Sequence, residues 1–144
     1  MATTGKKPSS PAPHETPDAC EAAFYDAFRS GDLEAMDAVW GPAGRILCVH
    51  PGRPPLAGRR AVMQSWADIL GATGGVRVRF ECHDRAQAGS LAVHTGLEII
   101  GDPGEDPSLV TVTNVYELTK AGWKIRLHHT GPVHRNSARS GPLH

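Results

Sequence analysis

Two polar side chains interrupt alternating apolar runs near the end of the chain. His129 continues the apolar alternation that starts at Trp123, and Asn114 stands between Val112 and Tyr116. A buried polar group without a partner costs a few kcal/mol, so each of them needs a partner or a ligand. We expect both to face the interior, His129 as a general base or hydrogen-bond anchor and Asn114 as a donor or acceptor. The alternative is a satisfied core pair, and a β-bulge would turn either side chain to the opposite face.

His50 is the second candidate for acid–base chemistry. It ends a short β-like run that begins at Arg45 and precedes the proline-rich stretch 51–55, which forbids regular structure. Loops on a rigid scaffold often carry function, so His50 is expected at the mouth of a pocket; the alternative is that it only caps the loop. By the same alternation, His94 and His128 are expected to point toward solvent or a second copy of the chain.

Aromatic side chains are candidates for the wall of a pocket that binds a small apolar ligand. The candidates are Trp40, Trp66, Tyr25 and Tyr116, which would bind the ligand together with Asn114. The alternative is that they are plain core residues.

The sequence carries no signature of a metal or cofactor site. The histidines form no HxH or HxxxH pair with a nearby carboxylate, and adjacent histidines on one strand diverge. No GxSxG, P-loop or GxGxxG motif occurs. The three cysteines, Cys20, Cys48 and Cys82, are widely spaced and odd in number. We therefore expect no metal, no cofactor and no disulfide framework.

The elements that must position these residues follow from the hydrophobic period. From Val76 onward the period is two, over four runs joined by turns, which predicts an antiparallel meander with one buried face. The predicted inward positions are Val76, Val78, Phe80 and Cys82; Leu91, Val93, Thr95, Leu97 and Ile99; Val110, Val112, Asn114, Tyr116 and Leu118; and Trp123, Ile125, Leu127 and His129. The acidic, Pro- and Gly-rich stretch 101–108 is predicted to be an exposed hairpin loop.

Helices are predicted before the sheet. Thr16 is a good N-cap, with proline next in the chain, and Gly31 suits the end of that helix. Asp32 can cap a second helix over 33–40, and a third is expected over 59–70. Helices on one face of an antiparallel sheet define an α+β architecture.

One domain fits the 144 residues. The predicted domain spans 15–131, and the Pro- and Ser-rich ends, 1–14 and 132–144, are expected to be disordered. The formal charge of zero argues against nucleic-acid or membrane-surface partners. No signal peptide or spanning apolar run is evident, so the cytoplasm is the expected location.

Several strings resemble one family. They are the run from Phe24 to Asp32 (FYDAFRSGD), VHPG at 49–52, LAGR at 56–59, SW at 65–66, GWK at 122–124 and HH at 128–129. Together they resemble the SnoaL-like branch of the nuclear transport factor 2 superfamily, which also contains ketosteroid isomerases and scytalone dehydratases. The resemblance implies a cone-shaped, curved antiparallel sheet packed on three N-terminal helices (a cystatin-like roll). It also implies a pocket inside the cone and a homodimer formed through the sheet.

Two functions stay open at this point. The first is a small-molecule enzyme of the isomerase, dehydratase or hydrolase type, acting on an apolar substrate with His129 or His50 as base. The second is a non-catalytic ligand-binding or dimerisation domain. Ketosteroid isomerases use an Asp base with a Tyr and a protonated Asp; that trio has no place here, because Asp84 and Glu98 fall off the predicted inward faces. The predicted dimer face carries Ala92, Gly96, Thr111, Thr113 and Val115.

Overall fold

The computed structural model describes residues 12–134, and its elements follow the predicted order. The helices are α1 (Pro17–Ser30), α2 (Leu33–Val39) and α3 (Arg59–Thr73), with a single 3₁₀ turn, η1 (Ala43–Arg45). The strands are β1 (Leu47–Val49), β2 (Leu56–Ala57), β3 (Val78–Ala88), β4 (Leu91–Ile100), β5 (Ser108–Thr119) and β6 (Gly122–Pro132). The predicted α+β class is confirmed.

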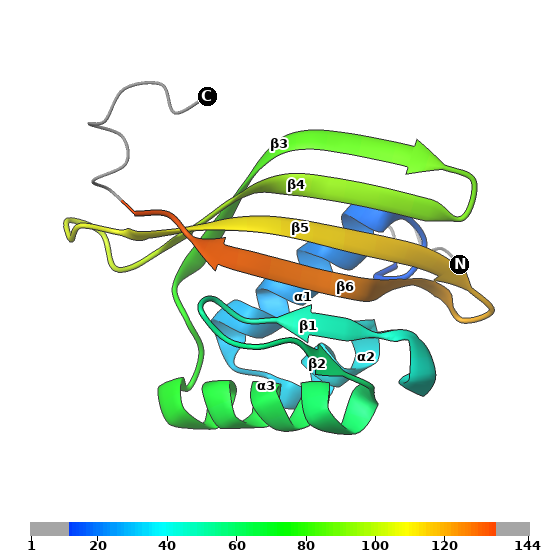
Figure 1. Cartoon of the computed structure of the whole chain (residues 1–144), viewed down its shortest axis with the longest axis horizontal. Helices are drawn as coiled ribbons and strands as arrows, with labels where there is room; N and C mark the ends of the chain where they lie inside the picture. The colour runs from blue at the N-terminus through cyan, green and yellow to red at the C-terminus, as the bar shows by residue number, and fades with distance from the viewer. Residues whose placement is uncertain (1–11, 135–144) are drawn as a thin grey trace, which may run out of the picture.

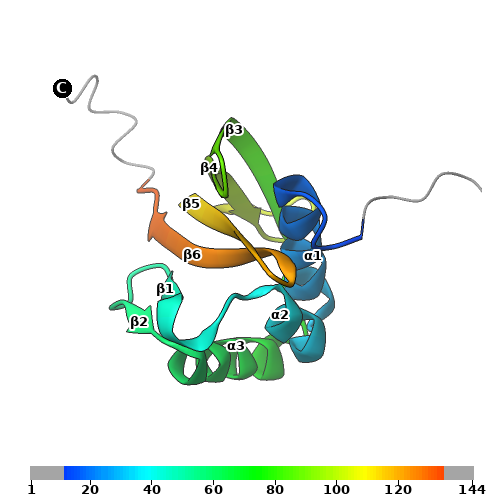
Figure 2. The ribbon, with the colours of Figure 1, turned by 90° about the vertical axis from the view of Figure 1, so that its right-hand side faces the viewer.

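The strands form one curved, six-stranded sheet in the order β2-β1-β6-β5-β4-β3 (Figure 1). Strands β3 to β6 pair antiparallel as a meander, as predicted, while β1 adds to β6 in parallel and β2 closes that edge. Figure 2 shows α1 and α2 on one side of the sheet, with α3 beneath β1 and β2. The sheet is therefore mixed rather than purely antiparallel, because the short run before the proline-rich loop also joins it.

Local sequence signals begin and end the helices. The Thr16 hydroxyl accepts a hydrogen bond from the backbone N–H of Ala19, and the Asp32 carboxylate caps α2 in the same way. Gly31 ends α1 in the left-handed region at φ 71°, where a Cβ atom would lie 2.6 Å from the backbone of Gly74. Glycine is thus required there both by the backbone conformation and by the close approach of the end of α3.

The helices pack on the sheet through an aromatic core. Phe24 of α1 meets Trp66 of α3 edge to face, with ring centroids 5.5 Å apart, and both side chains are fully buried. Burying each such ring stabilises the fold by about 2–3 kcal/mol. The guanidinium of Arg59 donates to the backbone oxygens of Asp37, Trp40 and Gly41, which ties the start of α3 to the end of α2. These contacts fix α3, and with it the side chains that α3 presents to β1.

The expected tails lie mostly outside the described residues, which exclude 1–11 and 135–144. The described residues next to these two ranges form backbone hydrogen bonds with the sheet. His14 accepts a hydrogen bond from the Trp123 N–H through its backbone oxygen at 2.8 Å, and Val133 donates to the Leu109 oxygen at 3.0 Å.

Facing along two strands differs from the prediction. On β6, Val115 pairs with Leu127 and Tyr116 with Ile125, so a bulge inserts Arg126. Beyond that bulge the facing reverses. His128 is buried at 1% exposure and His129 is exposed, so the predicted inward placement of His129 and outward placement of His128 are both wrong.

On β4 the whole alternation is reversed. Ala92, His94 and Glu98 are 1–2% exposed and face the helices. The alternate residues face outward; they are Leu91, Val93, Thr95, Leu97 and Ile99. The predicted outward positions of His94 and Glu98, and of Ala92 in a dimer face, are therefore wrong. The reason is that β4 is apolar on one side and mixed on the other, and polar partners on α1 decide which side is buried.

Candidate functional site

Four polar side chains meet in the interior between α1 and the sheet. Asn114 of β5 and His128 of β6 are register partners, and the Asn114 oxygen accepts from His128 Nδ1 at 2.6 Å. Asn114 Nδ2 donates to the Tyr25 hydroxyl at 3.1 Å, and that hydroxyl donates to Glu98 Oε2 at 2.7 Å. In this series of hydrogen bonds, every donor points toward Glu98. We call Tyr25, Glu98, Asn114 and His128 the polar cluster.

Burial disfavours the charged form at both ionisable ends of the polar cluster. It raises the pKa of Glu98 to about 7, although the hydrogen bond from Tyr25 works in the opposite direction. It lowers the pKa of His128 to about 3, with the charges of His50 and His129 adding to the effect. His128 Nε2 lies 3.9 Å from Glu98 Oε2. This contact is not an ion pair at neutral pH, because desolvation of each group outweighs their attraction.

A cavity of about 490 Å³ opens beside this cluster, between α3 and the loop that joins β1 to β2. We call it the His50 cavity. Its lining residues are His50, Arg53, Pro54, Leu56, Ser65, Asp68, Ile69, Ala72 and Thr73. Of the three ionisable side chains in this set, His50 is buried at 9% exposure, while Arg53 and Asp68 are exposed. The cavity therefore joins an apolar wall to one sheltered imidazole.

Helix α3 holds the imidazole of His50 in one orientation. The Ser65 hydroxyl donates to the Val62 backbone oxygen at 2.6 Å, so its lone pairs accept from His50 Nε2 at 2.8 Å. Burial, and then the positive charge of Arg53, lower the pKa of His50. His50 is consequently a neutral imidazole at pH 7, which is the form that takes up a proton.

The Cys48 thiol lies 3.5 Å from the same His50 nitrogen, but it is not an activated nucleophile. Cys48 is fully buried, and burial raises the pKa of its thiol to about 12. A thiol of that pKa carries almost no thiolate at neutral pH. Of these two side chains, His50 is the one suited to take up a proton near neutral pH.

The polar cluster and the His50 cavity are neighbours within the cone. The rings of His50 and His128 are 6.4 Å apart, and Trp66 packs against both, at 4.9 and 5.9 Å. The members of the polar cluster pair with one another, which fits a structural role. His50 reaches both a cavity and a polar partner, which fits contact with a ligand.

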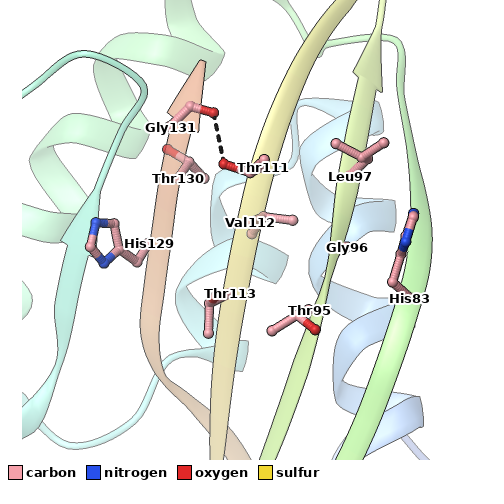
Figure 3. A pocket seen from close by; sticks show the side chains of 10 residues that line it. All are labelled: His83, Thr95, Gly96, Leu97, Thr111, Val112, Thr113, His129, Thr130 and Gly131. Carbon is pink, nitrogen blue, oxygen red and sulfur yellow. Dashed lines mark hydrogen bonds between the residues drawn. The ribbon is translucent and has the colours of Figure 1, made fainter. Parts of the chain in front are cut away.

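His129 lies on the other face of the sheet, away from the helices. It lines a groove of about 560 Å³ together with His83, Thr95, Leu97, Thr111 and Thr113 (Figure 3). Thr113 pairs with Thr95 and His129 across neighbouring strands, so these side chains form one outward row. His129 therefore joins neither His50 nor Asn114.

The predicted aromatic residues are core residues. Trp40, Trp66, Tyr25 and Tyr116 are 0–2% exposed, and none of them lines the His50 cavity. Tyr25 and Asn114 do meet, as members of the polar cluster. Of the predicted site residues, only His50 lines this cavity.

Sequence reasoning missed His128 and Glu98 as interior residues. Ser65 stands in the SW string at 65–66, but it was not predicted as a partner of His50. The signal available for Ser65 and Arg53 was their position, one beside Trp66 and the other in the loop after His50. Glu98 gave no signal, because its burial depends on Tyr25 from a distant helix.

Within residues 12–134, no group of three or more His, Cys, Asp or Glu side chains is placed to hold a metal ion. No helix in the same range has the length and apolar character needed to cross a bilayer.

The three helices and the curved sheet form a cystatin-like fold, which solved structures at 15–17% identity share. The family model described as a SnoaL-like domain matches residues 18–133. The chain therefore belongs to the SnoaL-like domain family, within the nuclear transport factor 2 superfamily. No curated protein matches the sequence.

Two solved structures share about a third of their residues with this chain. One is a proposed calcium/calmodulin-dependent protein kinase type II association domain from Thiobacillus denitrificans, with 33% identity and a TM-score of 0.78, covering 84% of this chain and 98% of that one. The other is a proposed dehydratase of the NTF2-like family from Streptomyces avermitilis, with 34% identity and a TM-score of 0.68, covering 81% and 94%. A ketosteroid isomerase-like protein from Erwinia carotovora atroseptica, at 19% identity and a TM-score of 0.59 over 81% and 93%, shares the fold.

Proposed function

We propose that this chain binds a small, mostly apolar organic molecule in the His50 cavity and that His50 acts on it as a general base. The observation that carries the proposal is a buried, neutral imidazole, oriented by Ser65, on the wall of a cavity of about 490 Å³. Leu56, Ile69 and Ala72 supply apolar surface beside it. Apolar walls with a few placed polar groups suit small organic ligands.

The reaction class that fits this site is proton transfer. A neutral His50 takes a proton from a carbon or oxygen acid of the ligand and returns it elsewhere, as isomerisation and dehydration require. Ser65 accepts from Nε2–H, so Nδ1 is the ring nitrogen that takes the proton in each cycle. The dehydratase proposed for the relative from Streptomyces avermitilis is in line with this class.

Replacing His50 with glutamine is expected to weaken ligand binding about tenfold, the scale of one lost polar contact in a sheltered site. The measurement is a thermal-shift screen of a metabolite library with wild type, followed by calorimetric titration of each hit against the variant. His83→Gln is the matched control, because His83 is exposed on the opposite face of the sheet and lies outside this cavity.

For a hit that is also turned over, we expect kcat/KM to fall on the acidic side with an apparent pKa below 6.5, since the pKa of His50 is lowered. His50→Gln should abolish that limb. Hits that bind equally well to His50→Gln would contradict the proposal. If a ligand binds through His50 but is not turned over, the chain is a ligand-binding domain and His50 is not a general base.

A second candidate function is assembly through the outer face of the sheet. The observation that favours it is the groove of about 560 Å³ on that face. Its lining contains threonines and Leu97 besides ionisable side chains. The relative from Thiobacillus denitrificans is itself proposed to be an association domain. A twofold copy that packs on this face would bury the outward row of Thr95 and Thr113.

Thr113→Arg is expected to convert such a dimer to monomers, because the cation would sit at the middle of the buried face without a partner. Light scattering at protein concentrations on the order of tens of micromolar measures the mass. Arg60→Gln, on the exposed side of α3, is the control. A monomeric wild type would remove this candidate function.

A further inference from the structure

The loop that follows His50 is a rigid turn. The Arg53 N–H donates to the His50 oxygen at 3.0 Å, and Gly52 between them adopts φ 71°. With Pro51 as the other central residue, this is the pattern of a type II β-turn. Pro54 and Pro55 follow directly and restrict the chain further. The turn therefore keeps the backbone of Arg53 next to His50 with little freedom.

Arg53 brings a positive charge to the His50 cavity. Its side chain lines the cavity, and its charge adds to the effect of burial in lowering the pKa of His50. Arg29 and Arg59 hold aspartates at 2.6 and 2.8 Å. Across residues 12–134, the side chain of Arg53 has no such carboxylate and no hydrogen bond within the protein.

The other charge on the cavity wall is the carboxylate of Asp68. It accepts a hydrogen bond from Gln64 Nε2 at 2.9 Å, one turn away on α3, and forms no ion pair with Arg53. The cavity thus has an apolar wall, a neutral imidazole, the Asp68 carboxylate at its rim and a guanidinium that no carboxylate among residues 12–134 pairs with.

We propose that the ligand of the His50 cavity is a small apolar carboxylic acid, whose carboxylate pairs with Arg53 while its apolar body lies on Leu56 and Ile69. This inference rests on the proposed function of the same cavity. A guanidinium matches a carboxylate with two parallel hydrogen bonds, which an alcohol or an amine cannot form. The rigid turn keeps the backbone's share of the entropy loss on binding small. His50 then faces the part of the ligand next to the carboxylate.

The test compares three ligands of one shape, phenylpropionate, phenylpropanol and phenylpropylamine, by ligand-observed NMR titration. Wild type is expected to bind the acid about tenfold more tightly than the alcohol, and the amine more weakly still, on the scale of one charge-assisted hydrogen-bond pair. Arg53→Gln should remove the preference for the acid and leave alcohol binding unchanged. Asp68→Asn should strengthen acid binding, because it removes a like charge from the rim. Arg60→Gln is the control for net charge.

The outcomes separate the two proposals. If wild type binds the acid and the alcohol equally, and His50→Gln weakens both, the proposal of a carboxylic acid ligand is wrong. The proposal that the His50 cavity binds a ligand then stands. A preference for the acid that survives Arg53→Gln also overturns the proposal of a carboxylic acid paired with Arg53. Absence of binding by all three ligands, together with no hit from the metabolite screen, overturns the proposed function and the carboxylate with it.

Discussion

Asn114→Ala will lower the free energy of unfolding by about 3 kcal/mol. Asn114 is fully buried and bridges His128 Nδ1 to the Tyr25 hydroxyl. Its removal leaves the imidazole N–H without an acceptor and the hydroxyl without a donor. Each buried group left in this way costs about 1–3 kcal/mol. Urea denaturation followed by fluorescence measures the change.

Lys120→Ala is the control for this prediction. Lys120 directly follows β5 and is exposed. Its truncation should change the stability by less than about 0.5 kcal/mol. A loss below about 1 kcal/mol for Asn114→Ala would mean that the polar cluster does not stabilise the fold.

Glu98→Gln will change how stability depends on pH, by about 3 kcal/mol between pH 4.5 and pH 7. The pKa of Glu98 is raised from 4.5 to about 7 on folding, and one pKa unit is worth about 1.4 kcal/mol. A raised pKa gives stability that is fully present below the unfolded pKa and is lost as pH rises through the folded pKa. The stability of wild type relative to Glu98→Gln should therefore fall across that window.

His128 supplies the opposite slope. Its pKa falls from 6.5 to about 3 on folding, so its contribution is present above pH 6.5 and is lost as the pH falls toward 3. Between pH 4.5 and 6.5 the two groups offset each other in wild type. Glu98→Gln should then become more stable as pH rises through this window, and His128→Asn should become less stable. Both substitutions keep a hydrogen-bonding group at the altered position.

Denaturant melts at several pH values measure these slopes. The two variants serve as controls for each other, because surface carboxylates contribute to both in the same way. Parallel stability curves for wild type and Glu98→Gln would show that Glu98 ionises in the folded protein as it does in the unfolded chain. That result would contradict a desolvated polar cluster.

Short-range signals were enough to predict the helices and the meander. Thr16 and Asp32 cap helices by contacts with residues three positions away, and Gly31 adopts a conformation that other residues disfavour. Such interactions depend on neighbours in the chain, so they can be read from the sequence. The inward face of β5 was predictable from Val110 to Tyr116 for a related reason, since most of its apolar residues share that side, although Leu118 is exposed.

The facing of β4 and β6 was not predictable in this way. One inserted residue, Arg126, turns His128 inward and His129 outward, and no local pattern marks the bulge. On β4, Glu98 and His94 are buried because Tyr25 and Glu21 of α1 hydrogen-bond to them at 2.7 Å. A polar residue is buried when a partner satisfies it, and these partners lie 73 positions away.

The elements, their order, the family resemblance and the candidate His50 at the end of a strand could therefore be predicted from the sequence. Tertiary packing was needed to show which histidines face the interior, that Glu98 joins Tyr25 there, and that Ser65 and Arg53 flank His50. The difference lies in the range of the interactions. Capping and hydrophobic period act over a few residues, whereas burial of a polar group depends on partners that folding brings together from distant parts of the chain.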